Sequence, residues 1–176
     1  MKPEVGDSKG ASSSRLRQDD YQARTHGLAD LEANSAVDAA LCRFESVTPL
    51  WAGGVIPPRK ALKFQHFVGW HARMVVSDLL ENGDLRFRII GDRVMDMFGR
   101  RLKAGDLFSG LPHVTFDDYA DYFKAIRAGG AYGRYSGVIP FEGQDHRSFE
   151  VLDLPAANEE GQPAFLFSFF FLGRAR

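Results

Sequence analysis

Ten residues near the C-terminus, Pro163 to Leu172, read PAFLFSFFFL and leave few options for the fold. Successive side chains of an extended chain point to opposite faces, so alternate residues share a face. One face then carries Phe165, Phe167, Phe169 and Phe171, and the other carries Leu166, Ser168, Phe170 and Leu172. Both faces are apolar, as is typical of a strand covered on both sides. The run therefore predicts a central strand of a sheet.

Composition and charge limit the classes of protein that fit. Hydrophobic residues make up 44% of the 176 residues, which is enough for a core. The 22 Lys and Arg nearly balance the 23 Asp and Glu, so the chain lacks the basic footprint of nucleic-acid binding. The single cysteine, Cys42, allows no internal disulfide and fits a reducing compartment. With no apolar run near the length of a membrane span and no signal region, we expect a cytoplasmic protein without membrane contact.

The first part of the chain divides into two predicted segments. Residues 1–34 contain few large apolar side chains and carry balanced charge, which predicts a disordered leader that does not bind nucleic acid. Ser35 followed by Asp38 resembles a capping box. Apolar residues at helical spacing then follow, so residues 35–62 are predicted to hold an N-terminal helix and a loop. Residues 63–176 are predicted to form the main domain.

The order of predicted elements in the main domain favours an α+β fold. Residues 74–80 and 85–90 alternate as strands around the turn residues Asn82 and Gly83. A short helix near residue 94 follows. A longer helix comes next, with Thr115 as its N-cap, Gly129-Gly130 at its end and an apolar stripe of Phe116, Tyr119, Ala120, Phe123 and Ile126. Three further strands are predicted at 131–141, 147–154 and 163–172. We expect one antiparallel five-stranded sheet with short helices and the longer helix on one face, plus the N-terminal helix.

This order resembles the PAS fold, and a compact bacterial PAS family in particular. That family is marked by a Trp at a helix end, a Pro-Arg step, an Arg-x-x-Gly at the end of the second strand and a Leu-Pro after the fourth. This chain has Trp51, Pro58-Arg59, Arg88 to Gly91, and Leu154-Pro155. It departs from the family's Gly-x-Asp-Leu-Thr-Gly stretch, where residues 99–104 read GRRLKA. The similarity spans roughly residues 40–172 and implies a last strand paired with the first in mid-sheet.

The resemblance implies a stand-alone sensory or regulatory module in signal transduction, with its output passing to a partner protein. A small apolar ligand would lie between sheet and helices, and Arg88, Tyr119 and Phe123 are the candidate ligand-binding residues. The alternative is that Tyr119 and Phe123 are core and Arg88 is solvated. Cys42 precedes the first strand, which argues against a flavin–cysteine adduct, and helix 116–128 has no histidine for haem. The cofactor stays unknown.

Two other classes of function stay open: a small α+β enzyme acting on an apolar substrate, and a protein–protein adaptor without a cavity. The enzyme would need a buried polar pair such as His113 with Asp117. The alternative places His113 in a loop and uses Asp117 to complement the helix end. Common hydrolase, zinc-protease and phosphate-loop motifs are absent, so no catalytic residue is assigned. His66 and His71 are five residues apart and do not share a helical face, so no metal site is expected.

The second face of the sheet, which the expected helices leave uncovered, leads us to predict a homodimer. The expected helical layer covers one face only, and a large exposed apolar patch is unusual for a monomer. Helix 35–46 and Trp51 could cover the other face within one chain or across a dimer. The PAS resemblance implies dimers through such an N-terminal helix, so we predict a homodimer with this helix at its interface.

Overall fold

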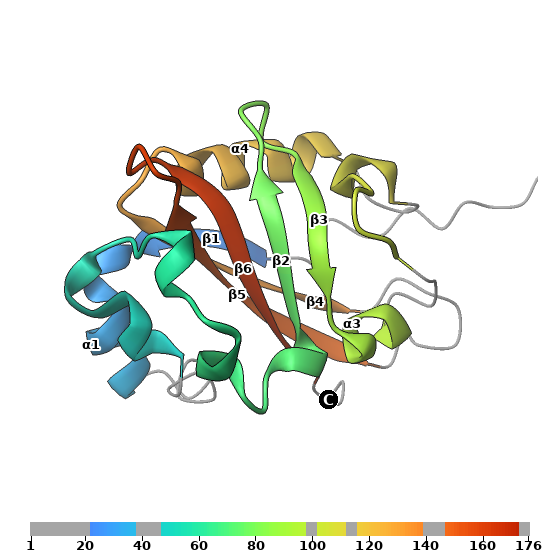
Figure 1. Ribbon diagram of the computed structural model, residues 1–176. Helices are drawn as coiled ribbons and strands as arrows, with labels where there is room; N and C mark the ends of the chain where they lie inside the picture. Colours follow the sequence, from blue (N-terminus) through green and yellow to red (C-terminus); the bar gives the residue numbers. More distant parts are fainter. Residues whose placement is uncertain (1–21, 38–46, 98–101, 112–115, 139–146, 173–176) are drawn as a thin grey trace, which may run out of the picture.

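A computed structural model describes residues 22–37, 47–97, 102–111, 116–138 and 147–172. Its centre is one antiparallel six-stranded sheet with the order β1-β4-β5-β6-β2-β3 (Figure 1). The strands are β1 (Gln22–Gly27), β2 (Met74–Leu79), β3 (Leu85–Ile90), β4 (Ala131–Val138), β5 (Ser148–Ala157) and β6 (Pro163–Leu172). The α-helices are α1 (Leu31–Val37), α3 (Asp92–Met97) and α4 (Phe116–Arg127). The α+β class and the antiparallel sheet are confirmed.

The predicted central position of the C-terminal strand is confirmed. β6 pairs with β5 on one side and with β2 on the other. Phe167 and Phe169 lie in one apolar cluster, whereas Leu166 lies in another on the opposite face. Phe170 also packs on that second face, so the alternation expected from the sequence holds. Burial on both faces explains why this strand is apolar at almost every position.

One face of the sheet is covered by a layer from the N-terminal part of the same chain. Short 3-10 helices build much of it: η2 (Leu28–Asp30), η3 (Thr48–Gly54), η4 (Arg59–Ala61), η5 (Phe64–Phe67) and η6 (His71–Arg73). Trp51 and Phe67 are buried in this layer, and both rings lie against Phe167. The Trp51 indole Nε1 also donates a hydrogen bond of 2.6 Å to the Pro155 carbonyl of β5. We call this set of elements the N-terminal layer.

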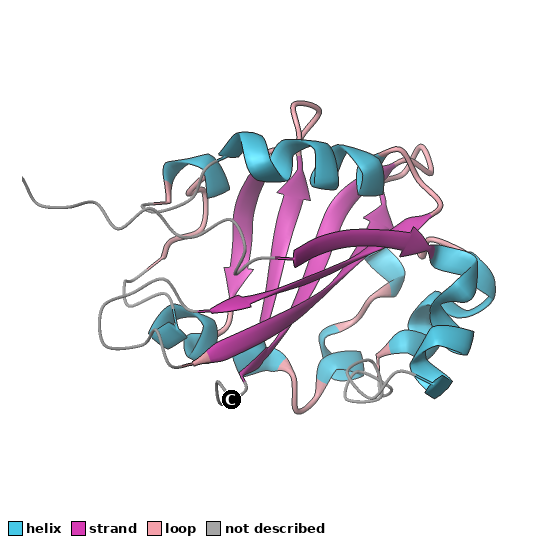
Figure 2. Ribbon diagram, turned by 180° about the vertical axis from the view of Figure 1, so that it is seen from behind, coloured by secondary structure: helices cyan, strands magenta, loops and turns pink. Residues whose placement is uncertain are grey.

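The opposite face carries α4, α3 and the 3-10 helix η7 (Phe108–Gly110) (Figure 2). Phe123 and Ile126 of α4 pack on Leu79 and Leu166. At the helix end, the Arg127 guanidinium donates to the carbonyls of Leu79 at 2.7 Å and of Pro163 at 3.1 Å. Gly129, with φ +93°, follows the helix as its predicted stop. α4 is therefore tied to the neighbouring strands β2 and β6.

The N-terminal part of the chain differs from the sequence prediction. Residues 22–34 were expected to belong to a disordered leader, yet β1 pairs with β4 at the edge of the sheet and α1 begins at Leu31. Ser35 therefore lies inside α1 and is not its N-cap. The sheet gains a sixth strand because β1, whose sequence is QARTHG, is held by backbone pairing and needs no apolar face. Residues 1–21 and 38–46, including Cys42, lie outside the described residues.

The remaining predicted elements are placed close to where the sequence indicated. The hairpin of β2 and β3 turns at Asn82 and Gly83, and Gly83 has φ +84°. β5 continues to Ala157, so Leu154 and Pro155 lie within the strand and do not follow it. Between the N-terminal residues of the layer and β2, residues 64–67 and 71–73 form two separate 3-10 turns, η5 and η6. Among the described residues, no helix is long and apolar enough to cross a membrane.

Candidate functional site

A buried polar network links α4 to the middle of the sheet. The Tyr122 hydroxyl donates a hydrogen bond of 2.7 Å to Oδ2 of Asp153, and the Ser168 hydroxyl donates to Oδ1 of the same carboxyl group. All three side chains are buried, and Asp153 is only 3% exposed. Each carboxyl oxygen therefore has a partner, as a buried acid requires. We call these three residues the Asp153 network.

Strand register brings the network together. Asp153 of β5 stands directly opposite Ser168 of β6 and, on its other side, opposite Gly133 of β4. A side chain at Gly133 would collide with Tyr122, because a Cβ there would lie 2.0 Å from the phenol oxygen and 2.7 Å from Cδ1 of Ile126. The bare backbone at Gly133 thus makes room for Tyr122 to reach Asp153. The network depends on one residue from each of four elements.

Burial shifts the proton equilibrium of the network. It raises the pKa of Asp153 from 3.8 to about 6, although the hydrogen bonds from Ser168 and Tyr122 act in the opposite direction. The pKa of Tyr122 is raised well above its usual value, first by burial and then by the nearby Asp153 charge. Tyr122 therefore stays protonated as a donor, while Asp153 changes charge near pH 6. The site can hold or release one proton inside the core.

Two of the predicted ligand-binding residues border this network. Tyr119 and Phe123 lie on α4 and pack with Phe108, with ring centroids 5.2 and 5.4 Å from its ring. The Tyr119 hydroxyl also bonds to the Tyr135 hydroxyl of β4. Phe123 is buried in the same apolar cluster as Tyr122. The structure thus gathers an aromatic cluster, Phe108, Tyr119, Phe123 and Tyr135, beside the Asp153 network.

Arg88, the third predicted ligand-binding residue, lies on the other face. Its guanidinium pairs with the Asp78 carboxylate and sits 5.7 Å from the ring centre of Phe165. The Arg88 side chain is 56% exposed, whereas that of Asp78 is 14% exposed. Arg88 is therefore an exposed ion-pair residue on the face of the N-terminal layer. It does not join Tyr119 and Phe123 in one pocket.

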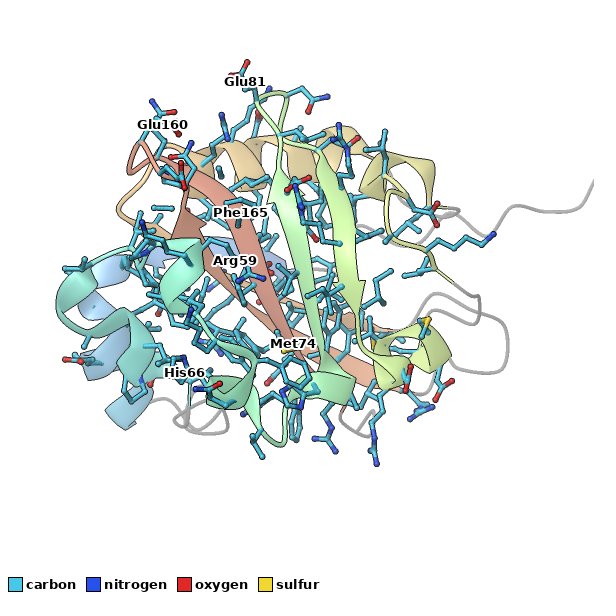
Figure 3. All side chains as sticks on the ribbon, in the orientation of Figure 1. Arg59, His66, Met74, Glu81, Glu160 and Phe165 are labelled. Atoms are coloured by element: carbon cyan, nitrogen blue, oxygen red, sulfur yellow. The ribbon has the colours of Figure 1, made fainter. Side chains whose placement is uncertain are left out.

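A groove opens on that face between η4 and the turn that joins β5 to β6. Its volume is about 260 Å³, and it is lined by Pro58, Arg59, Lys60, Ala157, Asn158, Glu159 and Phe165. Arg59 reaches over the sheet with its guanidinium 5.3 Å from the ring centre of Phe167, and it lies on the same face as Phe165 (Figure 3). Arg59 also donates to the Leu62 carbonyl at 3.2 Å. This arrangement clamps η4 onto β6 and leaves a shallow hollow beside it.

The other candidate residues from the sequence are His66, His71, His113 and Asp117. His113 lies outside the described residues, and of Asp117 only its place in α4 is described. His66 Nδ1 accepts the Lys63 backbone N–H, and His71 Nε2 bonds to the Phe64 carbonyl at 2.9 Å. Across the described residues, no three His, Cys, Asp or Glu side chains gather in a way that could hold a metal ion.

Sequence reasoning missed Tyr122, Asp153 and Ser168 as a group. The predicted apolar stripe of the long helix left out Tyr122, yet this side chain is buried. A usable signal was present: Asp153 lies between Leu152 and Leu154, and Ser168 interrupts the Phe-rich run. Acids are almost never fully buried without a partner, so an acid inside an apolar strand predicts a polar partner in the core. The sequence does not show which helix residue supplies it.

Ser77 of β2 adds an unsatisfied group on the same face. Among the described residues its hydroxyl is buried and has no hydrogen-bond partner. We expect Ser77→Ala to raise the free energy of unfolding by about 1 kcal/mol, because the variant no longer desolvates an unpaired hydroxyl. Ser168→Ala is the matched control, since its hydroxyl has a partner, and it should lower stability. Urea unfolding of both variants measures this, and equal losses would contradict the assignment of Ser77.

The close contact at Gly133 gives a second prediction. Gly133→Ala should lower the free energy of unfolding by about 1–3 kcal/mol, because Tyr122 and Ile126 are buried and must shift to admit a methyl group. Gly110→Ala is the control, because a Cβ at Gly110 meets nothing within 4 Å. Thermal or urea unfolding measures both. Equal stability of the two variants would show that α4 does not pack on β4 as described.

The geometry of the Asp153 network supports core packing more directly than covalent chemistry. Ser168 and Asp153 are shielded from solvent by the strands around them and by α4. A reactive serine would need a base and access to substrate, whereas this hydroxyl donates to a buried carboxyl group.

Comparisons with protein-family models, curated proteins and solved structures found no match for this chain.

Proposed function

We propose that the chain is a PAS-like sensory or regulatory module whose response element is the contact between α4 and the sheet. The observation that carries the proposal is the pairing of β6 with both β5 and β2 in mid-sheet. This is the arrangement that the PAS resemblance implied for the last and first strands of its five-stranded sheet. β1 is then an added edge strand, next to β4. The long helix of the fold corresponds to α4.

The positions that carried the resemblance lend further support, because several of them meet in space. Trp51 donates its indole hydrogen bond to Pro155, and Arg59 lies over the Phe167 ring. The segment at Pro57 joins β5 through a hydrogen bond of 2.9 Å from the Ala157 N–H. These short motifs therefore act together in holding the N-terminal layer on the sheet.

The proposed signal acts at the Asp153 network and the aromatic cluster beside it. A small apolar molecule bound against Tyr119 and Phe123, or a change in the proton on Asp153, would alter how α4 sits on β4, β5 and β6. α4 is bonded to β5 through Tyr122 and to β2 and β6 through Arg127. A shift at the network would thus reach the ends of β2 and β6. The output would pass to a partner protein.

Native mass spectrometry and a thermal-shift screen test the ligand. We expect either a copurified small molecule or a small apolar compound that raises the unfolding temperature. Phe123→Ala should weaken that stabilisation, whereas Phe64→Ala, at a 67% exposed position in the N-terminal layer, should leave it unchanged. If no compound binds, or if both variants respond alike, ligand sensing at this site is contradicted and the adaptor without a cavity is the better account.

The predicted homodimer no longer has the support of an uncovered sheet face. That face is packed against Leu28, Leu31, Val47, Trp51, Leu62 and Phe67 of the same chain. The dimer stays a prediction from the resemblance alone. Light scattering at micromolar concentration tests it, and a monomer would contradict it.

A further inference from the structure

The charges of this chain are unevenly distributed along the sequence. Residues 46–77 contain four Lys and Arg and no Asp or Glu, whereas the other 144 residues hold 18 Lys and Arg and 23 Asp and Glu. The four basic residues are Arg59, Lys60, Lys63 and Arg73. All four fall within η4, η5, η6 and the connections between these 3-10 helices. The part of the N-terminal layer from η3 to η6 therefore carries a local positive charge that the net charge of −1 conceals.

Apolar side chains project from the same segment. Phe64 is 67% exposed and Val68 is 74% exposed, while Phe67 between them is 2% exposed. Single exposed apolar residues are common on protein surfaces. Here two of them lie four residues apart in a basic segment, and the buried Phe67 anchors them to the core through Phe167 and Phe169. We call residues 60–73 the basic apolar loop.

Local contacts hold the shape of this loop. The rings of Phe64 and His71 stack with centroids 3.6 Å apart and planes inclined by 2°. His71 Nε2 bonds to the Phe64 carbonyl at 2.9 Å, and the Trp70 N–H donates to the Phe67 carbonyl at 2.8 Å. His66, labelled in Figure 3, marks the loop at the lower edge of the molecule, away from α4. Phe64 and Val68 are thus held in place at the surface. Binding through them would cost little further conformational entropy.

We propose that the basic apolar loop docks the protein onto an anionic lipid surface. Lysine and arginine near such a surface each contribute about 1 kcal/mol, and exposed aromatic and aliphatic side chains insert at the headgroup boundary. The segment itself contains no Asp or Glu, although Glu159 of the turn between β5 and β6 lines the groove beside Arg59 and Lys60. A segment with charges of one sign fits a partner that is negative over its whole surface. The aliphatic Val68 favours lipid over a nucleic-acid backbone. The protein would then be peripheral to the membrane and not span it.

Vesicle flotation with the full chain tests this proposal. We expect binding to vesicles of phosphatidylcholine with about one third phosphatidylserine, little binding to phosphatidylcholine alone, and loss of binding in high salt. Lys60→Gln with Lys63→Gln should weaken binding roughly 30-fold. Phe64→Ser with Val68→Ser should weaken it about tenfold or more, because the inserted apolar area is lost.

Matched variants on the far side of the sheet separate the loop from general charge effects. Lys103→Gln with Lys124→Gln changes the same number of charges at exposed positions in the segment before η7 and on α4, and it should leave vesicle binding unchanged. Circular dichroism and thermal unfolding check that each variant is folded. Equal weakening by both charge pairs, no binding to anionic vesicles, or tighter binding to a short DNA duplex than to the vesicles would overturn the proposal.

Discussion

Phe167→Ala should lower the free energy of unfolding by about 3–5 kcal/mol. Phe167 is 1% exposed, and its ring centroid lies 5.4 Å from that of Phe67 and 6.1 Å from that of Trp51. Truncation would open a cavity where the N-terminal layer meets β6, and it would also remove the ring beneath Arg59. Urea unfolding followed by tryptophan fluorescence measures the loss, since Trp51 lies at this contact.

Two further variants make the result interpretable. A small domain has a total stability of about 5–15 kcal/mol, so Phe167→Ala could be largely unfolded. Phe167→Leu keeps most of the apolar volume and should cost less than about 1.5 kcal/mol. Phe64→Ala removes an exposed phenylalanine from the same layer and should cost about 0.5 kcal/mol or less. A loss for Phe167→Ala as small as that for Phe64→Ala would contradict burial of this face.

Asp153→Asn should change the pH dependence of stability by about 2–3 kcal/mol between pH 4 and pH 7. Burial raises the pKa of Asp153 in the folded protein to about 6, against 3.8 ordinarily, so the folded state binds the proton more tightly than the unfolded state. The stability that this group contributes is therefore complete below about pH 4 and is lost as the pH rises through 6. Asparagine has no group that titrates in this range. The stability of the variant relative to the wild type should therefore increase as the pH rises.

Urea unfolding of both proteins at several pH values measures this difference. The asparagine can still accept one hydrogen bond and donate another, because both the Tyr122 and the Ser168 hydroxyl can also accept. Asp96→Asn, at an exposed position on α3, is the control for a change of charge alone and should leave the slope of stability against pH as in the wild type. A constant difference between Asp153→Asn and the wild type from pH 4 to 7 would show that the Asp153 carboxyl is solvated.

Apolar patterning accounts for the parts of the fold that could be predicted. The alternation in residues 163–172 indicated both the strand and its two buried faces, because a strand covered on both sides must be apolar at nearly every position. Asn82 and Gly83 indicated the hairpin through the backbone angles that such a turn requires. Phe123 and Ile126, at helical spacing, marked the face of α4 that packs on the sheet. In each case the local sequence itself carries the information.

Elements held by backbone pairing or by distant partners could not be predicted in this way. β1 has no apolar pattern, because an edge strand is stabilised by hydrogen bonds to β4 and its side chains are mostly exposed. The Asp153 network depends on the register of β5 with β6 and on a helix 31 residues earlier in the chain, which no local pattern encodes. The position of Arg88 shows the same limit. Alternation with Phe87 indicated a face but not which layer covers it.

Hydrogen exchange in the C-terminal strand, measured residue by residue by NMR, tests the central position of β6 most directly. Neighbouring amides of a strand point to opposite sides, so an edge strand protects every second amide while a central strand protects them all. We predict slow exchange at each consecutive amide from Leu166 to Phe169, which face β5 and β2 in turn. β1 should show the alternating protection of an edge. Alternating protection within Leu166 to Phe169 would contradict the sheet order and the PAS-like function inferred from it.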